Sequence, residues 1–152
     1  MRKGDRLISK NRRAHFDYDL GERFEAGVVL IGSEARSLRE SPADLTDAWV
    51  DIDRGEAYVK GMRIPALKHA AFGHEEKRAR KLLLHRSQID QLRAAVDRDR
   101  MTLVVTKAYF KQGRVKLEVA LAKGRKHADK RHAIKQRDAA REARDAIRRA
   151  KG

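Results

Sequence analysis

The sequence predicts a mainly β protein: a small antiparallel β-barrel with flanking helices, followed by a basic C-terminal tail. Two features predict the body. About six short apolar runs are separated by turn residues, and no regular alternation of strands with helices points to a parallel sheet. The third feature is the last thirty residues, which hold twelve Lys or Arg against four Asp or Glu. We therefore expect a folded unit over residues 1–122 and a tail over residues 123–152.

The N-terminal part predicts a leader, a strand and a short helix. Residues 1–13 are polar and basic, and we expect a loose leader. Residues 24–31 are rich in β-branched side chains, which is typical of a strand. Ser33 is a suitable N-cap for a helix over residues 34–39, which has an acid in its first turn and Arg39 at its end.

A hairpin follows. The short apolar runs 48–52 and 57–59 flank Asp53-Arg54-Gly55-Glu56, and the glycine at the turn indicates a hairpin. Ile64-Pro65 suggests a strand edge. Residues 66–73 have a weak pattern and predict a loop.

Residues 75–99 predict a helical block. Leu82-Leu83-Leu84 form an apolar step within it, and Ser87 with Asp90 resembles a capping box. A core-facing stripe follows at helical spacing, made of Ile89, Leu92 and Val96.

Residues 102–110 and 114–121 predict two strands joined across Lys111-Gln112-Gly113. In the second strand Val115, Leu117, Val119 and Leu121 alternate with Lys116, Glu118 and Ala120, so one face is buried and the other is in water. The helix inserted between strands, together with the basic composition, favours a barrel of oligonucleotide-binding (OB-like) type.

The net charge indicates the kind of partner. The chain carries +15 at pH 7 and its pI is about 10.5, which fits a partner of dense negative charge. RNA is favoured over DNA or an anionic membrane. No apolar run approaches the roughly twenty residues of a spanning helix, so we expect no membrane association and no secretory signal. The absence of cysteine suits a reducing cytoplasm, where we expect the protein to reside.

The residues do not suggest catalysis, a metal or a cofactor. The histidines His69, His74, His85, His127 and His132 lack the close pairing of a zinc helix. Acids crowd residues 17–25, but in so charged a chain they are more often partners of Lys and Arg. No nucleophile–base pair and no phosphate-binding loop is visible. We therefore expect a protein that is not an enzyme.

A basic and aromatic segment is the stronger candidate for a site. Residues 11–18 mix Asn11, Arg12 and Arg13 with the rings of Phe16 and Tyr18. Splayed RNA bases stack on rings while arginines hold phosphate. Equally, the two rings could open the first strand and pack inward. The sequence has a second basic group, made of Arg78, Arg80 and Lys81. It could be a phosphate patch, or it could be only the solvated face of a helix.

The tail has a spacing of its own. Ile134, Lys135, Arg137 and Arg141 follow Asp129-Lys130-Arg131 at helical spacing, and alanines fill many of the remaining positions. Alanine and arginine are strong helix formers, so we expect a tail that is disordered when free and becomes a helix once phosphate neutralises it. The alternative is a nonspecific solubilising extension.

Six blocks then form a familiar set across nearly the whole chain: Asn11-Arg-Arg-Ala14, Phe24-Glu-Ala-Gly-Val28, Gly32-Ser-Glu-Ala-Arg-Ser-Leu-Arg39, Arg78-Ala-Arg-Lys-Leu-Leu-Leu-His85, Leu121-Ala-Lys-Gly-Arg-Lys126, and Asp129-Lys-Arg131 with Ile134-Lys-x-Arg-Asp138. In this set the chain resembles the SsrA-binding protein family, also called small protein B (SmpB), the partner of bacterial transfer-messenger RNA (tmRNA). Any one of these blocks is weak evidence for the family, but six of them in the same order along the chain are specific for it.

The resemblance implies an adaptor that binds the tRNA-like domain of tmRNA and delivers it to stalled ribosomes for trans-translation. The expected partners are tmRNA and the ribosome, at the 16S rRNA, decoding centre and mRNA channel, with elongation factor Tu carrying alanyl-tmRNA. We expect a monomer. The alternative is a general ribosome- or nucleic-acid-associated basic protein without tmRNA specificity.

The resemblance also assigns residues. It implies an RNA-binding face that holds Asn11, Arg12, Arg13, Phe16, Glu34, Arg36 and Arg39. It implies a ribosome-engaging tail, made of Gly124, Lys126, Asp129, Lys130, Arg131, Ile134, Lys135 and Arg137. Three positions depart from many relatives: Phe16 stands where they have His, Ala128 stands where they often carry Tyr or His, and Glu76 replaces a common Pro in the loop ahead of Arg78.

Overall fold

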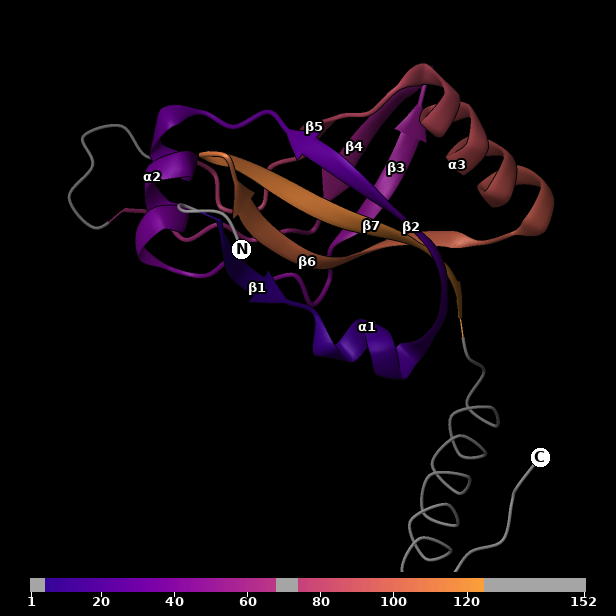
Figure 1. Cartoon of the computed structure of the whole chain (residues 1–152), viewed down its shortest axis with the longest axis horizontal. Coiled ribbons are helices and arrows are strands. Elements are labelled where there is room, and N and C mark those ends of the chain that lie inside the picture. The colour runs from indigo at the N-terminus through magenta and orange to yellow at the C-terminus, as the bar shows by residue number, and fades with distance from the viewer. Residues whose placement is uncertain (1–4, 68–73, 125–152) are drawn as a thin grey trace, which may run out of the picture.

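The structure is a computed structural model that describes residues 5–67 and 74–124. Within these residues the chain is mainly antiparallel sheet, with seven strands and three helices (Figure 1). The strands are β1 (Arg6–Lys10), β2 (Tyr18–Val28), β3 (Trp49–Asp53), β4 (Glu56–Lys60), β5 (Arg80–Leu83), β6 (Thr102–Lys111) and β7 (Arg114–Gly124). The helices are α1 (Arg12–Asp17), α2 (Gly32–Glu40) and α3 (Arg86–Asp99).

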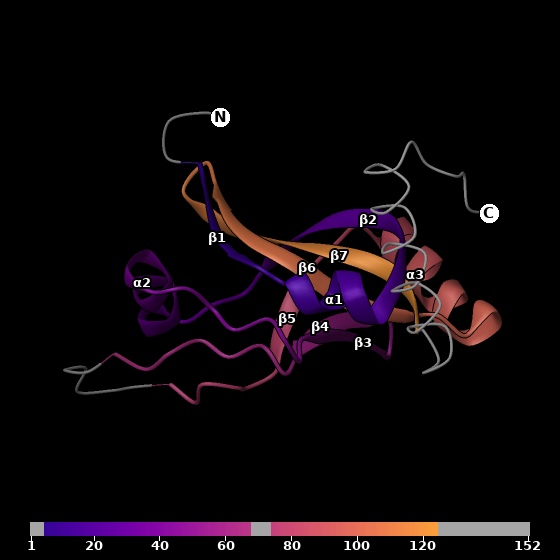
Figure 2. The ribbon, with the colours of Figure 1, turned by 90° about the horizontal axis from the view of Figure 1, so that it is seen from below.

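The strand pairings close on themselves. The order is β1-β6-β3-β4-β5-β2-β7, and β7 pairs back with β6. All pairings are antiparallel. Six strands therefore form a continuous ring, while β1 adds to β6 from outside it. Helices α2 and α3 lie at opposite ends of the sheet in both views (Figures 1 and 2).

Both predicted hairpins are confirmed. In the β3–β4 turn, Arg54 and Gly55 have φ of 51° and 76°, and in the β6–β7 turn Gln112 and Gly113 have 52° and 77°. Two central residues with positive φ match the type I′ turn, whose twist suits antiparallel strands. The registers agree, because Asp53 pairs with Glu56 and Lys111 with Arg114.

Two groups of buried side chains hold the sheet together. The main core lies inside the ring and includes the predicted Val115, Leu117 and Val119 of β7. A smaller cluster joins Ala14 of α1 to Val104, Ala120 and Ala122. Ala120 was expected in water, and it is buried because α1 covers that face of the strand.

The predicted leader is wrong in part. The structure describes residues from position 5 onward, and these form β1, which pairs with β6, and then α1. Strand β2 begins at Tyr18 and ends at Val28, earlier at both ends than predicted. Strand β7 runs to Gly124, three residues past the predicted end of that strand at Leu121.

The predicted helical block 75–99 is also wrong at its start. Residues Arg80–Leu83 form β5, and the helix begins only at Arg86. Strand pairing on both edges, with β4 and with β2, outweighs the helix propensity of Arg and Leu. The stripe is confirmed: Ile89 and Leu92 are buried, and Val96 packs against the core.

Helix starts and the connection after β4 differ from the predicted ones. Helix α2 begins after Ile31 instead of Ser33, and α3 begins after His85 instead of Ser87. The Gln88 side chain accepts from the His85 amide at 3.0 Å. The predicted strand edge at Ile64 is absent from the described residues, where the neighbouring Arg63 makes an isolated bridge with Asp44. The predicted loop 66–73 lies mostly outside the described residues.

Candidate nucleic-acid interface

Asn11 is buried and fixes α1 to the sheet. Its Nδ2 donates to the carbonyl oxygens of Leu45 at 2.8 Å and Val105 at 3.0 Å, and its Oδ1 accepts from the Ala14 amide at 3.1 Å. The last bond caps the N-terminus of α1. The side chain is 4% exposed, so its hydrogen bonds position the residues that follow it.

The residues that follow Asn11 lie on the surface of α1. Arg12 and Arg13 are exposed, and Phe16 is 38% exposed. Arg13 Nε lies 3.1 Å from Asp17 Oδ2. Tyr18 is partly buried against the smaller apolar cluster. Of the two rings, Tyr18 therefore packs inward and Phe16 presents part of its ring outward.

Glu34 has no exposed side-chain surface. Its carboxylate accepts hydrogen bonds from the Ile31 amide at 3.0 Å, from Arg78 Nε at 3.1 Å, and from Arg80. Burial raises the pKa of Glu34, but these bonds and the guanidinium charges outweigh it and hold the pKa below its ordinary value. The carboxylate is therefore ionised at neutral pH.

The partners of Glu34 tie α2 to β5. Arg80 is itself fully buried and donates to the Met62 carbonyl at 2.8 Å and the Glu76 carbonyl at 3.0 Å. Glu34 thus orients Arg78 and Arg80. The ion pair of Glu34 with Arg80 was not predicted from the sequence, which placed Arg80 in a phosphate patch or on a solvated helix face. Lys81 of the same group is exposed and pairs with Glu56.

The exposed cations of α2 lie near β1. Arg36 and Arg39 are exposed, and Arg6 Nη2 donates to the Arg39 carbonyl at 2.9 Å. Strand β1 then leads to Asn11 and α1. We give the name β1 strip to six exposed cations and one exposed ring of these three elements: Arg6, Lys10, Arg12, Arg13, Phe16, Arg36 and Arg39. Figure 1 shows β1 running between α2 and α1.

Glu25 lies at the centre of a further hydrogen-bond network. In the sequence this residue was visible only as one of the acids crowded into residues 17–25. Tyr109 Oη donates to Glu25, and Lys111 Nζ lies 3.3 Å from Glu25 Oε1. The Tyr109 bond, more than Lys111, lowers the pKa of Glu25. As expected, the acids Asp17 and Glu25 pair with cations. Across residues 5–67 and 74–124, no group of His, Asp and Glu could hold a metal ion.

Of the predicted tail, the structure describes only Gly124, the last residue of β7, which pairs with Tyr18. The other predicted tail residues lie outside the described residues: Lys126, Asp129, Lys130, Arg131, Ile134, Lys135 and Arg137. Among the helices of the described residues, none is long and apolar enough to cross a membrane.

A small, mainly antiparallel β protein with a basic surface strip is the class that fold and site define. The family model of the SmpB protein matches residues 8–149, and the chain belongs to this family. It is 52% identical to the SsrA-binding protein of Sorangium cellulosum, covering 96% of this chain and 90% of that protein. It is 46% identical to the SsrA-binding protein of Mycobacterium leprae (strain Br4923), covering 99% and 96%.

A solved structure is similar as well. It is described as "tmRNA-SmpB: a journey to the center of the bacterial ribosome". One of its chains matches with a TM-score of 0.69 at 33% identity, covering 85% of this chain and 95% of that chain.

Proposed function

We propose that the protein is an RNA-binding adaptor that binds tmRNA and delivers it to stalled ribosomes for trans-translation. The observation that carries the proposal is the family match over residues 8–149. The relatives are SsrA-binding proteins, and the similar solved chain is described with tmRNA and the ribosome. The partners are therefore tmRNA and the ribosome, with elongation factor Tu and alanyl-tmRNA as a further expected contact.

The β1 strip is the RNA-binding surface in this proposal. Its exposed arginines, Arg12, Arg13, Arg36 and Arg39, hold phosphates, and the outward part of the Phe16 ring stacks on a base. Asn11 and Glu34 act from beneath the surface. Asn11 fixes α1, and Glu34 fixes α2 and Arg78, whose side chain is 30% exposed.

The closed ring of strand pairings supports the finer proposal of an OB-type barrel. In that arrangement the folded unit holds the RNA, and the tail enters the empty mRNA channel and becomes helical. The tail carries eight of the chain's fifteen net positive charges, which suits a channel walled by RNA. The proposal has no catalytic step, and it places the protein in the cytoplasm as a monomer.

Binding of the tRNA-like domain of tmRNA tests the function. At about 0.15 M salt, where nonspecific affinity has largely faded, this RNA should bind much more tightly than a random duplex. Equal affinity for both would favour the alternative, a general basic nucleic-acid binder.

A charge-matched pair of double variants tests the surface. Arg36→Gln with Arg39→Gln removes two charges from the β1 strip, and Arg86→Gln with Arg98→Gln removes two exposed charges from α3. We expect the double variant of Arg36 and Arg39 to bind tmRNA on the order of tenfold or more weakly. The slope of its log affinity against log salt concentration should fall by the amount expected for the loss of about two phosphate contacts. An equal loss in both would assign binding to overall charge.

A further inference from the structure

The ring of strands is weakest between β3 and β6. These strands pair only at Trp49 and Val104, whereas β3 and β4 pair along their whole length. Two hollows adjoin this contact, and Trp49 and Thr102 line both of them. Trp49, the only tryptophan of the chain, is 42% exposed.

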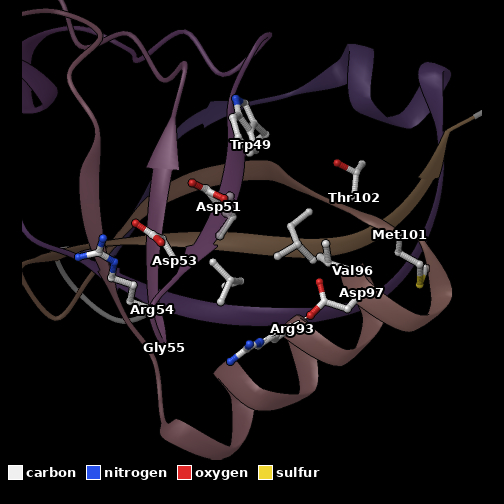
Figure 3. A pocket seen from close by; sticks show the side chains of 13 residues that line it. Trp49, Asp51, Asp53, Arg54, Gly55, Arg93, Val96, Asp97, Met101 and Thr102 are labelled. Carbon is white, nitrogen blue, oxygen red and sulfur yellow. Dashed lines mark ion pairs between the residues drawn. The ribbon is translucent and has the colours of Figure 1, made fainter.

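The hollow on the side of α3 has a volume of about 350 Å³. This is within the range of small-ligand pockets, about 300–1,000 Å³. Apolar side chains contribute to its wall, among them Ile52 and Val96. Figure 3 shows Trp49 at one end, with Asp51 and Asp53 on the strand side and Asp97 on the helix side.

The charge of this hollow differs from that of the protein. Three aspartates and two arginines line it, in a chain of net charge +15. Lys60 Nζ lies 2.8 Å from Asp51 Oδ2 and 5.5 Å from the centre of the Trp49 ring. Arg93 Nε lies 3.6 Å from Asp97 Oδ2. The wall of the hollow therefore carries carboxylate acceptors, and cations that can hold phosphate stand beside two of them, Asp51 and Asp97.

We propose that this hollow takes one unpaired nucleobase of a bound RNA, stacked on Trp49. The inference rests on the proposed RNA-binding function and adds a contact outside the β1 strip. A neutral ring suits the hollow because carboxylates repel a phosphate but accept N–H groups. Adenine, cytosine and guanine carry an exocyclic amino group that an aspartate accepts. Uracil has a carbonyl oxygen in place of the amino group of cytosine and offers only its N3–H as a donor, so the hollow disfavours it.

The fluorescence of the single tryptophan reports on this site directly. The full chain is titrated with equal-length single-stranded oligo(A), oligo(C), oligo(U) and an abasic ribose-phosphate oligomer. We expect saturable quenching by oligo(A) and oligo(C), on the order of tenfold weaker binding of oligo(U), and no quenching by the abasic oligomer. Equal quenching by the abasic oligomer, or none by any oligomer, would overturn the proposal.

Variants test the Trp49 ring and the aspartates of the hollow separately. Binding is followed by the fluorescence anisotropy of a labelled oligo(A). Trp49→Leu should weaken binding on the order of tenfold, and Trp49→Phe should restore most of it, because a ring returns. Asp53→Asn should narrow the preference for oligo(A) over oligo(U). Thermal unfolding checks that each variant folds. Equal affinities of the leucine and phenylalanine variants would contradict stacking.

Three outcomes separate this inference from its alternatives. If tmRNA binds tightly while Trp49 fluorescence and the Trp49→Leu affinity for oligo(A) are unchanged, the nucleobase site is wrong and the proposed function stands. If oligo(A) quenches but tmRNA binds no better than a random duplex, the proposed function fails alone. If deletion of residues 125–152 changes the fluorescence of the RNA-free protein and a peptide of that segment restores it, the occupant is the basic tail, and the nucleobase proposal is overturned.

Discussion

Glu34 and Arg80 form an ion pair in which neither side chain has exposed surface. They lie 46 positions apart in sequence, and the pair joins α2 to β5. Burial of two charges has a large desolvation cost, which only multiple hydrogen bonds offset. Here the remaining donors of Arg80 reach the carbonyls of Met62 and Glu76, so the pair also fixes the connection that leads into β5.

Removing the carboxylate charge should destabilise the fold strongly. Glu34→Gln leaves the buried Arg80 without its counter-charge, and breaking a buried pair costs about 3–5 kcal/mol. Equilibrium unfolding in urea at neutral pH measures this free energy. The matched control is Glu56→Gln, which breaks the exposed pair with Lys81 and should cost less than about 1 kcal/mol. Similar losses in both variants would contradict a structural role for the Glu34 charge.

The same carboxylate should make stability depend on acid. The pKa of Glu34 in the folded protein lies below its ordinary value of 4.5, so the unfolded chain binds its proton more readily. Its contribution is therefore fully present above about pH 4.5 and is lost as the pH falls through the folded pKa.

Unfolding free energies between about pH 7 and about pH 3 should show the Glu34 variant approaching the parent protein as the solution becomes acidic. Both proteins retain the slope from Glu25 and Asp44, whose pKa values are also lowered, Glu25 chiefly by Tyr109 and Asp44 by Thr46. A constant difference across this range would contradict the assignment.

Gly61 and Gly113 have nearly the same positive φ, 76° and 77°, but different surroundings. A Cβ at Gly61 would lie 2.2 Å from the Asp47 carbonyl oxygen, while a Cβ at Gly113 would meet nothing within 4 Å. Gly113→Ala should therefore cost only the left-handed backbone strain, about 1–2 kcal/mol. Gly61→Ala should cost clearly more, because the Asp47 backbone must also move. Urea unfolding compares them, and equal losses would show that the contact near Asp47 relaxes freely.

Deleting residues 125–152 should separate tmRNA binding by the folded unit from the proposed action of the tail on stalled ribosomes. The cut falls after Gly124, so β7 keeps its pairs of Lys123 with Asp19 and Gly124 with Tyr18. We expect tmRNA affinity at about 0.15 M salt to stay within about threefold of the full chain, because the β1 strip is intact. Tagging of stalled chains in a reconstituted translation system should be abolished. A loss of tmRNA affinity by orders of magnitude would place the main RNA contacts in the tail.

The local features of the fold were predictable where neighbours in sequence decide them. The turns at Gly55 and Gly113 need positive φ, and glycine supplies it. The stripe of Ile89 and Leu92 follows from helical spacing alone. Residues 80–83 were not predictable in the same way. Their apolar run suits a helix or a strand, and pairing with β4 and β2 selects the strand.

The candidate site also has features that the sequence predicts and features that it does not. The exposed arginines of α1 and α2 were recognised from residue type and from the blocks that resemble the family. The burial of Asn11 was not, because its acceptors at Leu45 and Val105 come from distant parts of the chain. Nor was the hollow at Trp49 visible in sequence, because its walls come from β3, α3 and the start of β6.

The sequence by itself determined the basic character of the protein, its two tight hairpins and its family. Those properties depend on composition, on turns of two residues and on short motifs read along the chain. Only the tertiary structure decided which charges are exposed and which are buried. Arg12 and Arg80 are the same residue type in basic segments, but one is exposed and the other has no exposed surface. The physical reason is that a buried guanidinium needs a carboxylate and carbonyl acceptors around it, and folding brings these together from α2, Met62 and Glu76.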